Sequence, residues 1–190
     1  MDYQEIIERR RALTIEPYKS LAEVGFDGPW GTPYQITSKS SEGPVLVALH
    51  WLDESSILTE RAMLQNLGYL PNIRFNTVID AALARQGLSR PDVYVTQTFH
   101  LIPRTRSERI SQAAIRRSFD EVTRFELQGR KVIALGDIAA GECARHNIEH
   151  IAVCHPSRRG YTNEKNAIEI AEAIAALGFR KAVETGKDDQ

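Results

Sequence analysis

The sequence predicts an α/β protein, a three-layer α/β/α sandwich around a central four-stranded, mostly parallel sheet. Three observations support this fold. Short, continuous apolar runs, typical of strands buried on both faces, occur four times along the chain. Amphipathic helical patterns separate these runs, and strands that alternate with helices favour a parallel sheet covered on both faces. The length of 190 residues suits one such domain, residues 1–190.

The expected elements follow one another in a regular order. Residues 3–13 suit an N-terminal helix, and the Gly- and Pro-rich segment 25–33 predicts a structured series of turns. The expected strands are residues 44–49, 93–96, 131–136 and 150–154. The expected helices are residues 75–86, 107–125, 138–146 and 163–177, and glycines follow three of them, as is typical of helix C-terminal ends.

Composition excludes several classes of protein. No apolar run reaches the roughly 18 residues that a membrane helix needs, and the N-terminus lacks the basic start and apolar stretch of a secretory signal. We therefore expect no membrane partner and a cytoplasmic protein, nucleoid-associated if bacterial, in which Cys143 and Cys154 are reduced thiols. Two thiols are too few for an iron–sulfur cluster and the histidines are scattered, so we predict no metal and no cofactor.

Charge is unevenly distributed along the chain. The net charge of −1 does not indicate a nucleic-acid partner, but arginines cluster in two stretches. They are Arg104, Arg106, Arg109, Arg116 and Arg117 in the first stretch, and Arg158 and Arg159 in the second. Phosphate binding depends on the local field, so these stretches fit a basic face. For Arg116 and Arg117, solvated positions on an exposed helix are an equally good interpretation.

Polar and ring-bearing side chains follow each expected strand directly. The segments are residues 50–54, 97–100, 136–137 and 155–160. Ligand sites of open parallel sheets lie beyond the carboxyl ends of the strands, so we expect these four segments to converge. Polar loops are also the default at strand ends, so convergence by itself specifies no activity.

Motifs in these segments resemble, in the same order, those of the uracil-DNA glycosylase superfamily. His155-Pro156-Ser157 is similar to the family's C-terminal His-Pro-Ser motif. Residues 87–97 resemble its second strand, which ends in Thr-Asn, and residues 102–106 resemble the Pro- and Arg-containing loop that follows. Residues 131–140 resemble its strand ending in Ala-Leu-Gly. The resemblance covers about residues 45–177. It implies a cofactor-free enzyme that hydrolyses the N-glycosidic bond of uracil in DNA, starting base excision repair. A monomer is the default expectation for an enzyme that must embrace DNA.

The chain departs from the family at three positions. Residues 49–54 contain no Gly or Pro, although the family's first motif is a Gly-rich turn with a catalytic acid, Asn or a substitute. Gln97 stands where the family has Asn. Arg158 and Arg159 follow the serine where one branch inserts a leucine, and an arginine there is more similar to the single-strand-selective branch, which carries Pro-Arg after the serine. The altered first motif leaves open a catalytically impaired protein that binds uracil or damaged DNA. An unrelated nucleotide-binding α/β protein is a third alternative.

The resemblance implies roles for individual residues in base recognition. His155 would donate a hydrogen bond to the oxygen of the departing uracil. Gln97 would read the Watson–Crick edge of the flipped base, or else bond the backbone at the strand end. Trp51 and Phe75 are the candidates for stacking on the base, although either ring also suits the core.

The resemblance also implies residues that position the attacking water and residues that bind DNA. Asp53, Glu54 and His50 are the candidates for positioning the attacking water, with Asp53 preferred. The two acids equally suit capping of a helix that starts near Ser55. The expected DNA-binding residues are Ser157, Arg158, Arg159, Arg104 and Arg106.

Overall fold

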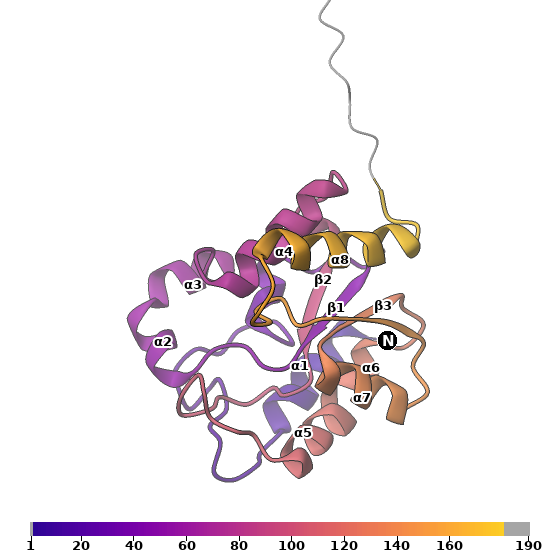
Figure 1. The fold of residues 1–190 in the computed structure, drawn as a ribbon. Coiled ribbons are helices and arrows are strands. Elements are labelled where there is room, and N and C mark those ends of the chain that lie inside the picture. The colour runs from indigo at the N-terminus through magenta and orange to yellow at the C-terminus, as the bar shows by residue number, and fades with distance from the viewer. Residues whose placement is uncertain (1, 181–190) are drawn as a thin grey trace, which may run out of the picture.

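A four-stranded parallel sheet forms the centre of the protein in this computed structural model, which describes residues 2–180 (Figure 1). Its strands are β1 (Val45–Ala48), β2 (Tyr94–Gln97), β3 (Val132–Leu135) and β4 (His150–Val153), in the order β2-β1-β3-β4. Every pairing between these strands is parallel, which confirms the predicted α/β class and makes the sheet entirely, not mostly, parallel.

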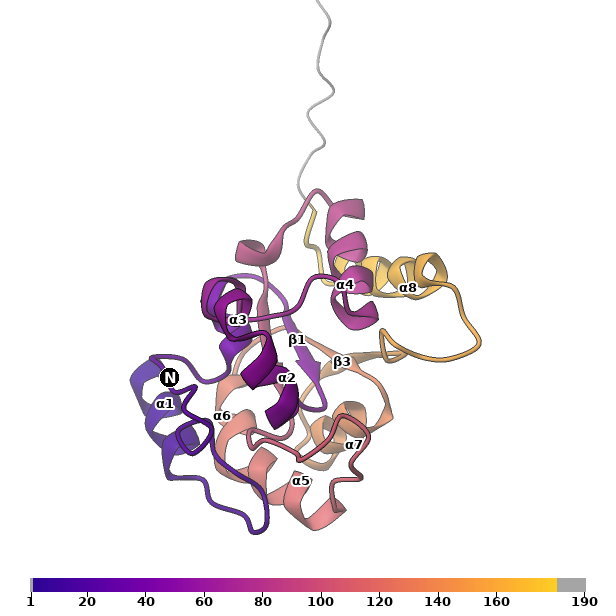
Figure 2. The same ribbon diagram turned by 90° about the vertical axis from the view of Figure 1, so that its left-hand side faces the viewer.

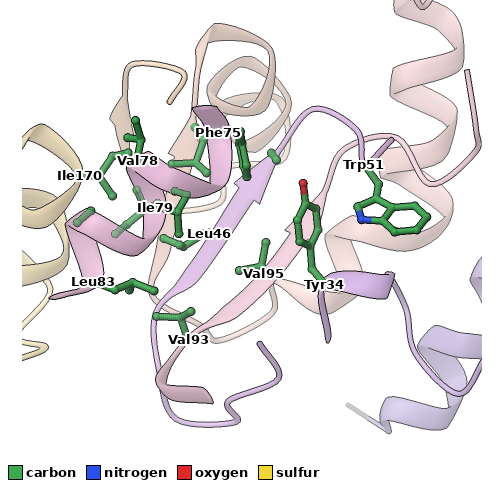
Figure 3. Packing of buried hydrophobic residues seen from close by; sticks show 14 of the residues in the cluster. Tyr34, Leu46, Trp51, Phe75, Val78, Ile79, Leu83, Val93, Val95 and Ile170 are labelled. Carbon is green, nitrogen blue, oxygen red and sulfur yellow. The ribbon is translucent and has the colours of Figure 1, made fainter. Parts of the chain in front are cut away.

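Helices cover both faces of the sheet, as the two orthogonal views show (Figures 1 and 2). On one face, α4 and α8 pack together over side chains such as Leu46 and Val95 (Figure 3). On the other face, α5 to α7 and α1 cover a second and a third cluster of buried residues. The helical elements are α1 (Tyr3–Ala12), η1 (Pro33–Ile36), α2 (Glu54–Thr59), α3 (Arg61–Leu67), α4 (Arg74–Arg85), η2 (Arg90–Asp92), α5 (Gln112–Ser118), the π-helical turn η3 (Phe119–Thr123), α6 (Arg124–Glu126), α7 (Asp137–Arg145) and α8 (Asn163–Ala176).

The two-sided cover explains the apolar strand sequences. Successive side chains of a strand point to opposite faces, so Leu46 and Ala48 enter the cluster under α4 and α8, whereas Val45 and Val47 enter the opposite one. All four positions of β1 are buried. Because neither face of this strand is exposed to solvent, polar and apolar residues do not alternate along it, and the run is continuously hydrophobic.

Helix boundaries differ from the prediction in two places. The helix expected over residues 107–125 begins only at Gln112, because the Ser111 hydroxyl caps it by accepting from the Ala114 N–H at 3.2 Å. Helix α3 was not predicted. Only Leu64 of α3 is buried, so this helix has almost no apolar stripe that a periodicity argument could detect. No helix among the described residues is long and apolar enough to cross a membrane.

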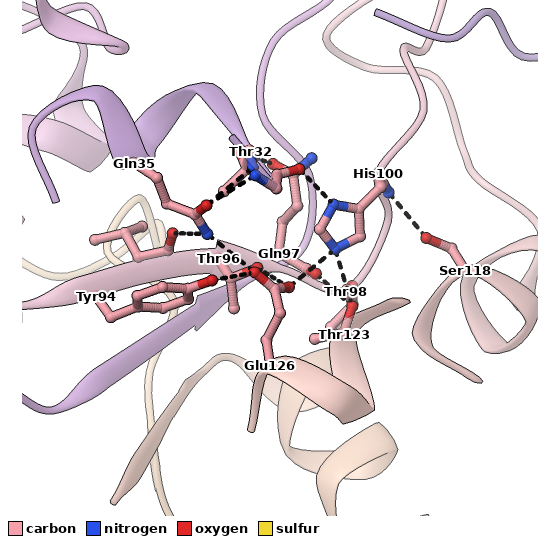
Figure 4. Close-up of polar contacts among 12 residues, drawn as sticks. Thr32, Gln35, Tyr94, Thr96, Gln97, Thr98, His100, Ser118, Thr123 and Glu126 are labelled. Atoms are coloured by element: carbon pink, nitrogen blue, oxygen red, sulfur yellow. Dashed lines mark hydrogen bonds and ion pairs between the residues drawn. The ribbon is translucent and has the colours of Figure 1, made fainter. Parts of the chain in front are cut away.

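A buried carboxylate ties several elements together on the face of β2 opposite α4 (Figure 4). Glu126 accepts hydrogen bonds from the Tyr94 and Thr96 hydroxyls, both at 2.6 Å, and from the Gln35 amide at 2.9 Å. The Nε2 atom of His100 lies 3.4 Å from the same carboxylate. We call these five residues the Glu126 network. Burial alone would raise the pKa of Glu126, but the hydrogen bonds and positive charge of its neighbours hold it below its usual value.

Hydrogen-bond directions assign a positive charge to His100. Its Nδ1 lies 3.2 Å from the Gly31 carbonyl oxygen, which only accepts. Its Nε2 lies 3.1 Å from the Thr123 hydroxyl, whose own proton is donated to the Gln97 carbonyl at 2.7 Å. Both ring nitrogens are therefore donors, and His100 and Glu126 form a fully buried ion pair.

Candidate functional site

A pocket of about 250 Å³ opens beyond the carboxyl ends of β1 and β4. Its walls come from segments far apart in the sequence. They are Tyr34 of η1, residues 49–52 after β1, Ile73 and Phe75 at the start of α4, Arg106 after β2, and His155 and Ser157 after β4. We call this the strand-end pocket. Two of the four segments expected to converge, those after β1 and β4, therefore meet in it.

Another hollow is larger but chemically different. It measures about 480 Å³ and lies beside α7, where Glu142 and Arg145 in its wall pair with each other at 2.7 Å. No aromatic ring lines it. The strand-end pocket combines rings with imidazoles, so it is the better candidate for a site that holds a base.

His155 enters the strand-end pocket on a short turn after β4. Its ring centroid lies 5.6 Å from that of Phe75. The Ser157 backbone N–H donates to Nδ1 of His155 at 3.1 Å. Burial lowers the pKa of His155, and the nearby His50 lowers it further, so the imidazole is neutral at pH 7.

The hydrogen bond from Ser157 selects the tautomer. Because Nδ1 accepts, the single proton of the neutral ring is on Nε2. None of the described residues accepts a hydrogen bond from that Nε2–H. The ring therefore presents a neutral donor with no protein partner.

Nitrogen NMR tests this assignment. We expect ¹⁵N-detected spectra to show His155 as the Nε2–H tautomer, with a titration midpoint below the ordinary 6.5. The unfolded chain takes up this proton at a higher pH than the folded protein, so the residue destabilises the fold as pH falls below about 6.5. A midpoint above that value, or an Nδ1–H tautomer, would contradict the assignment.

Gly136 lets β3 end directly under His155. Its φ of +98° lies where residues with a Cβ are strained, and an added Cβ would lie 3.2 Å from the Cβ of His155. Gly136 also precedes α7 as its N-terminal cap residue. The third strand end thus supports the histidine through close backbone approach rather than through a side chain.

Of the three candidates for positioning water, the structure places only His50 in the strand-end pocket. Burial lowers the pKa of His50, and its Nδ1 is buried without a partner among the described residues. Asp53 instead caps α2, accepting from the Ser56 N–H at 3.3 Å. Glu54 pairs with Lys19 at 2.7 Å. Asp53 thus takes the helix-capping position that was the alternative for both acids, whereas Glu54 lies in the first turn of α2 and forms an ion pair instead.

Of the residues expected to hold the base, some line the strand-end pocket and others do not. Gln97 is 1% exposed and does not line the pocket, because η1 covers the end of β2 and the Thr32 hydroxyl donates to the Gln97 side chain at 3.3 Å. Trp51 borders the pocket but is a core residue, with its indole N–H donating to the Gly68 carbonyl at 2.9 Å. Phe75 lines the pocket beside His155.

One arginine without a carboxylate partner lines the pocket, and three more lie in the chain segments that contribute to it. Arg106 lines the pocket, and Arg104 lies two residues earlier in the chain. Arg158 and Arg159 are exposed on the turn after His155. None of these four forms an ion pair within residues 2–180. By contrast, Arg116 and Arg117 pair with Glu142 and Glu121, so they occupy the solvated helix positions that were their alternative. Ser157 lines the pocket.

Sequence reasoning missed Tyr34 as a pocket residue. Tyr34 lies between Pro33 and Gln35 in η1, before the first strand, and no motif marks it. Only the folding of η1 over the end of β2 brings it to the pocket.

Within residues 2–180, no group of three or more His, Cys, Asp or Glu side chains could hold a metal ion. Neither a protein-family model nor a curated protein matches the chain.

Proposed function

We propose that this protein is a DNA glycosylase that hydrolyses the N-glycosidic bond of uracil in DNA, on a fold of the uracil-DNA glycosylase type. One observation carries the proposal: the unpartnered Nε2–H of neutral His155 in a ring-walled pocket at the strand ends. The family resemblance of residues 45–177 agrees with this placement.

The departing base makes the first chemical demand on the site. Dissociative cleavage moves the electrons of the glycosidic bond onto uracil, so negative charge grows on a base oxygen. A donor held in place before the reaction stabilises that charge without reorganising. The Ser157 N–H holds the ring of His155, leaving Nε2–H as the donor.

The second demand is water at the sugar. Once the bond to nitrogen has broken, water adds to the anomeric carbon of the cationic sugar, and a base must take the proton that water loses. His50 is neutral because burial lowers its pKa, so it has a nitrogen able to accept that proton. We therefore assign the water-positioning role to His50 rather than to Asp53.

A direct assay tests the proposal. The purified protein is incubated with single- and double-stranded oligonucleotides containing one uracil, and abasic sites are then cleaved with alkali. We expect scission at the uracil and none in matched oligonucleotides with thymine. Absence of scission in both substrates would contradict glycosylase activity.

One observation favours a second candidate, a protein that binds uracil-containing DNA without cleaving it. Asp53 and Glu54 are both engaged away from the pocket, so no carboxylate of residues 2–180 lines it to stabilise the cationic sugar. Retention of the uracil oligonucleotide without scission would favour this candidate.

The unpaired arginines predict a salt-dependent DNA affinity. Removing one phosphate-binding side chain should reduce the slope of log K against log salt by about 0.7 for single strands, so Arg106→Ala and Arg159→Ala should each do so. Arg85→Ala is the matched control, since Arg85 is already paired with Glu164 at 3.0 Å. Equal slopes for the wild type and all three variants, measured by fluorescence anisotropy, would exclude these arginines from the DNA interface.

A further inference from the structure

Tyr34 is held rigidly between the core and the strand-end pocket. Its side chain is 2% exposed, and its ring centroid lies 6.1 Å from that of Phe75. Neighbours of Tyr34 anchor η1 on both sides: the Thr32 hydroxyl bonds Gln97, and the Thr37 hydroxyl donates to the Leu67 carbonyl at 2.8 Å.

The hydroxyl of Tyr34 has no hydrogen-bond partner among the described residues. Figure 3 shows it pointing away from Val95, toward the carboxyl end of β1, in the space between Phe75 and Trp51. Burial raises the pKa of Tyr34, so the phenol keeps its proton and offers both a donor and an acceptor. Because Tyr34 lines the strand-end pocket, a ligand or water bound there can supply the partner that the protein does not.

The pocket also lacks the base-reading group expected from the sequence. Gln97 is covered by η1, and its side-chain oxygen accepts from Thr32. Phe75 provides only a ring face, and His155 provides only a donor. A base held there still needs a polar partner for the rest of its edge.

We propose that the Tyr34 hydroxyl contacts the edge of the flipped base, in place of the amide of Gln97. This inference rests on the proposed function, since the ligand is the excised base. A hydroxyl rotates to suit either a donor or an acceptor on the base. The contact is made equally to the bound substrate and to its transition state, so it acts on binding rather than on the chemical step.

The test is Tyr34→Phe, which removes one oxygen and keeps the ring. With a uracil oligonucleotide, we expect KM to rise roughly 3- to 10-fold and kcat to change little, as for the loss of one neutral hydrogen bond. Thermal stability should be unchanged or higher, because no protein partner loses a bond. Tyr18→Phe is the matched control: Tyr18 packs edge-on against Phe99 at 4.8 Å, does not line the pocket, and should leave KM unchanged.

Binding of free uracil, followed by calorimetry, separates failure of this inference from failure of the proposed function. Weaker uracil binding by the Tyr34→Phe variant supports the inference even if the wild-type protein cleaves nothing. An active wild-type enzyme with unchanged KM and uracil affinity in the variant overturns the inference alone. A wild type that neither cleaves nor binds uracil overturns both. A Tyr34→Phe variant that is less stable than the wild type also overturns the inference, because the hydroxyl would then have a structural partner.

Discussion

Replacing His155 with alanine is expected to lower kcat for uracil excision by roughly 100- to 1,000-fold, the range for removing a preorganised donor to a developing anion. The loss should appear in kcat more than in KM, since the donor acts mainly on charge that exists in the transition state. Single-turnover cleavage of a uracil oligonucleotide measures the chemical step directly.

The matched control is His150→Ala. His150 lies on β4, the strand that precedes His155, and its Nδ1 bonds the carbonyl of Ile148 at 2.8 Å. It does not line the strand-end pocket, so its replacement should leave kcat unchanged. Full activity in the His155→Ala variant would remove His155 from the catalytic machinery and with it the main support for the proposed mechanism.

Replacing Glu126 with glutamine is expected to lower the free energy of unfolding by about 3–5 kcal/mol, the range for breaking a buried ion pair on one side. The glutamine keeps the shape of the side chain but leaves the imidazolium of His100 without its counter-charge. Its NH2 group also places donors at one of the two oxygen positions, to which either Tyr94 or Thr96 donates now. Urea denaturation at pH 7 measures the change.

Acidity provides an independent check on the same pair. The pKa of Glu126 lies below its ordinary value of 4.5, so the stability it adds is present above that pH and is lost as the pH falls through the folded value. The Glu126→Gln variant should therefore lose less stability in acid than the wild type does.

Glu121→Gln is the control for that variant. Glu121 forms an exposed pair with Arg117, so its loss should change stability by about 1 kcal/mol or less. Equal stability losses in the two glutamine variants would show that the Glu126 network does not hold a buried charge.

Local patterns predicted much of the fold for identifiable reasons. Strands such as β1 are buried on both faces, so their sequences are continuous apolar runs that can be recognised. Helix α4 carries its buried positions, among them Val78 and Ile79, at helical spacing. Helices α2 and α3 bury too few residues to be recognised by that spacing.

The candidate site was predictable only in part. His155 directly follows a recognisable strand, and its position at the sheet edge follows from parallel topology alone. The place of Gln97 did not follow, because η1, some sixty residues earlier in the chain, covers it. The capping role of Asp53 was visible as an alternative but could not be chosen over catalysis, since both suit an acid that precedes a helix.

The amino-acid sequence by itself determined the α/β class, the four strands and the placement of His155 at a strand end, because each depends on residues near one another in the chain. The tertiary structure decided which strand ends share a pocket, that His50 rather than Asp53 faces it, and that Tyr34 enters it. These depend on contacts between distant segments, whose partners no local pattern of residues specifies.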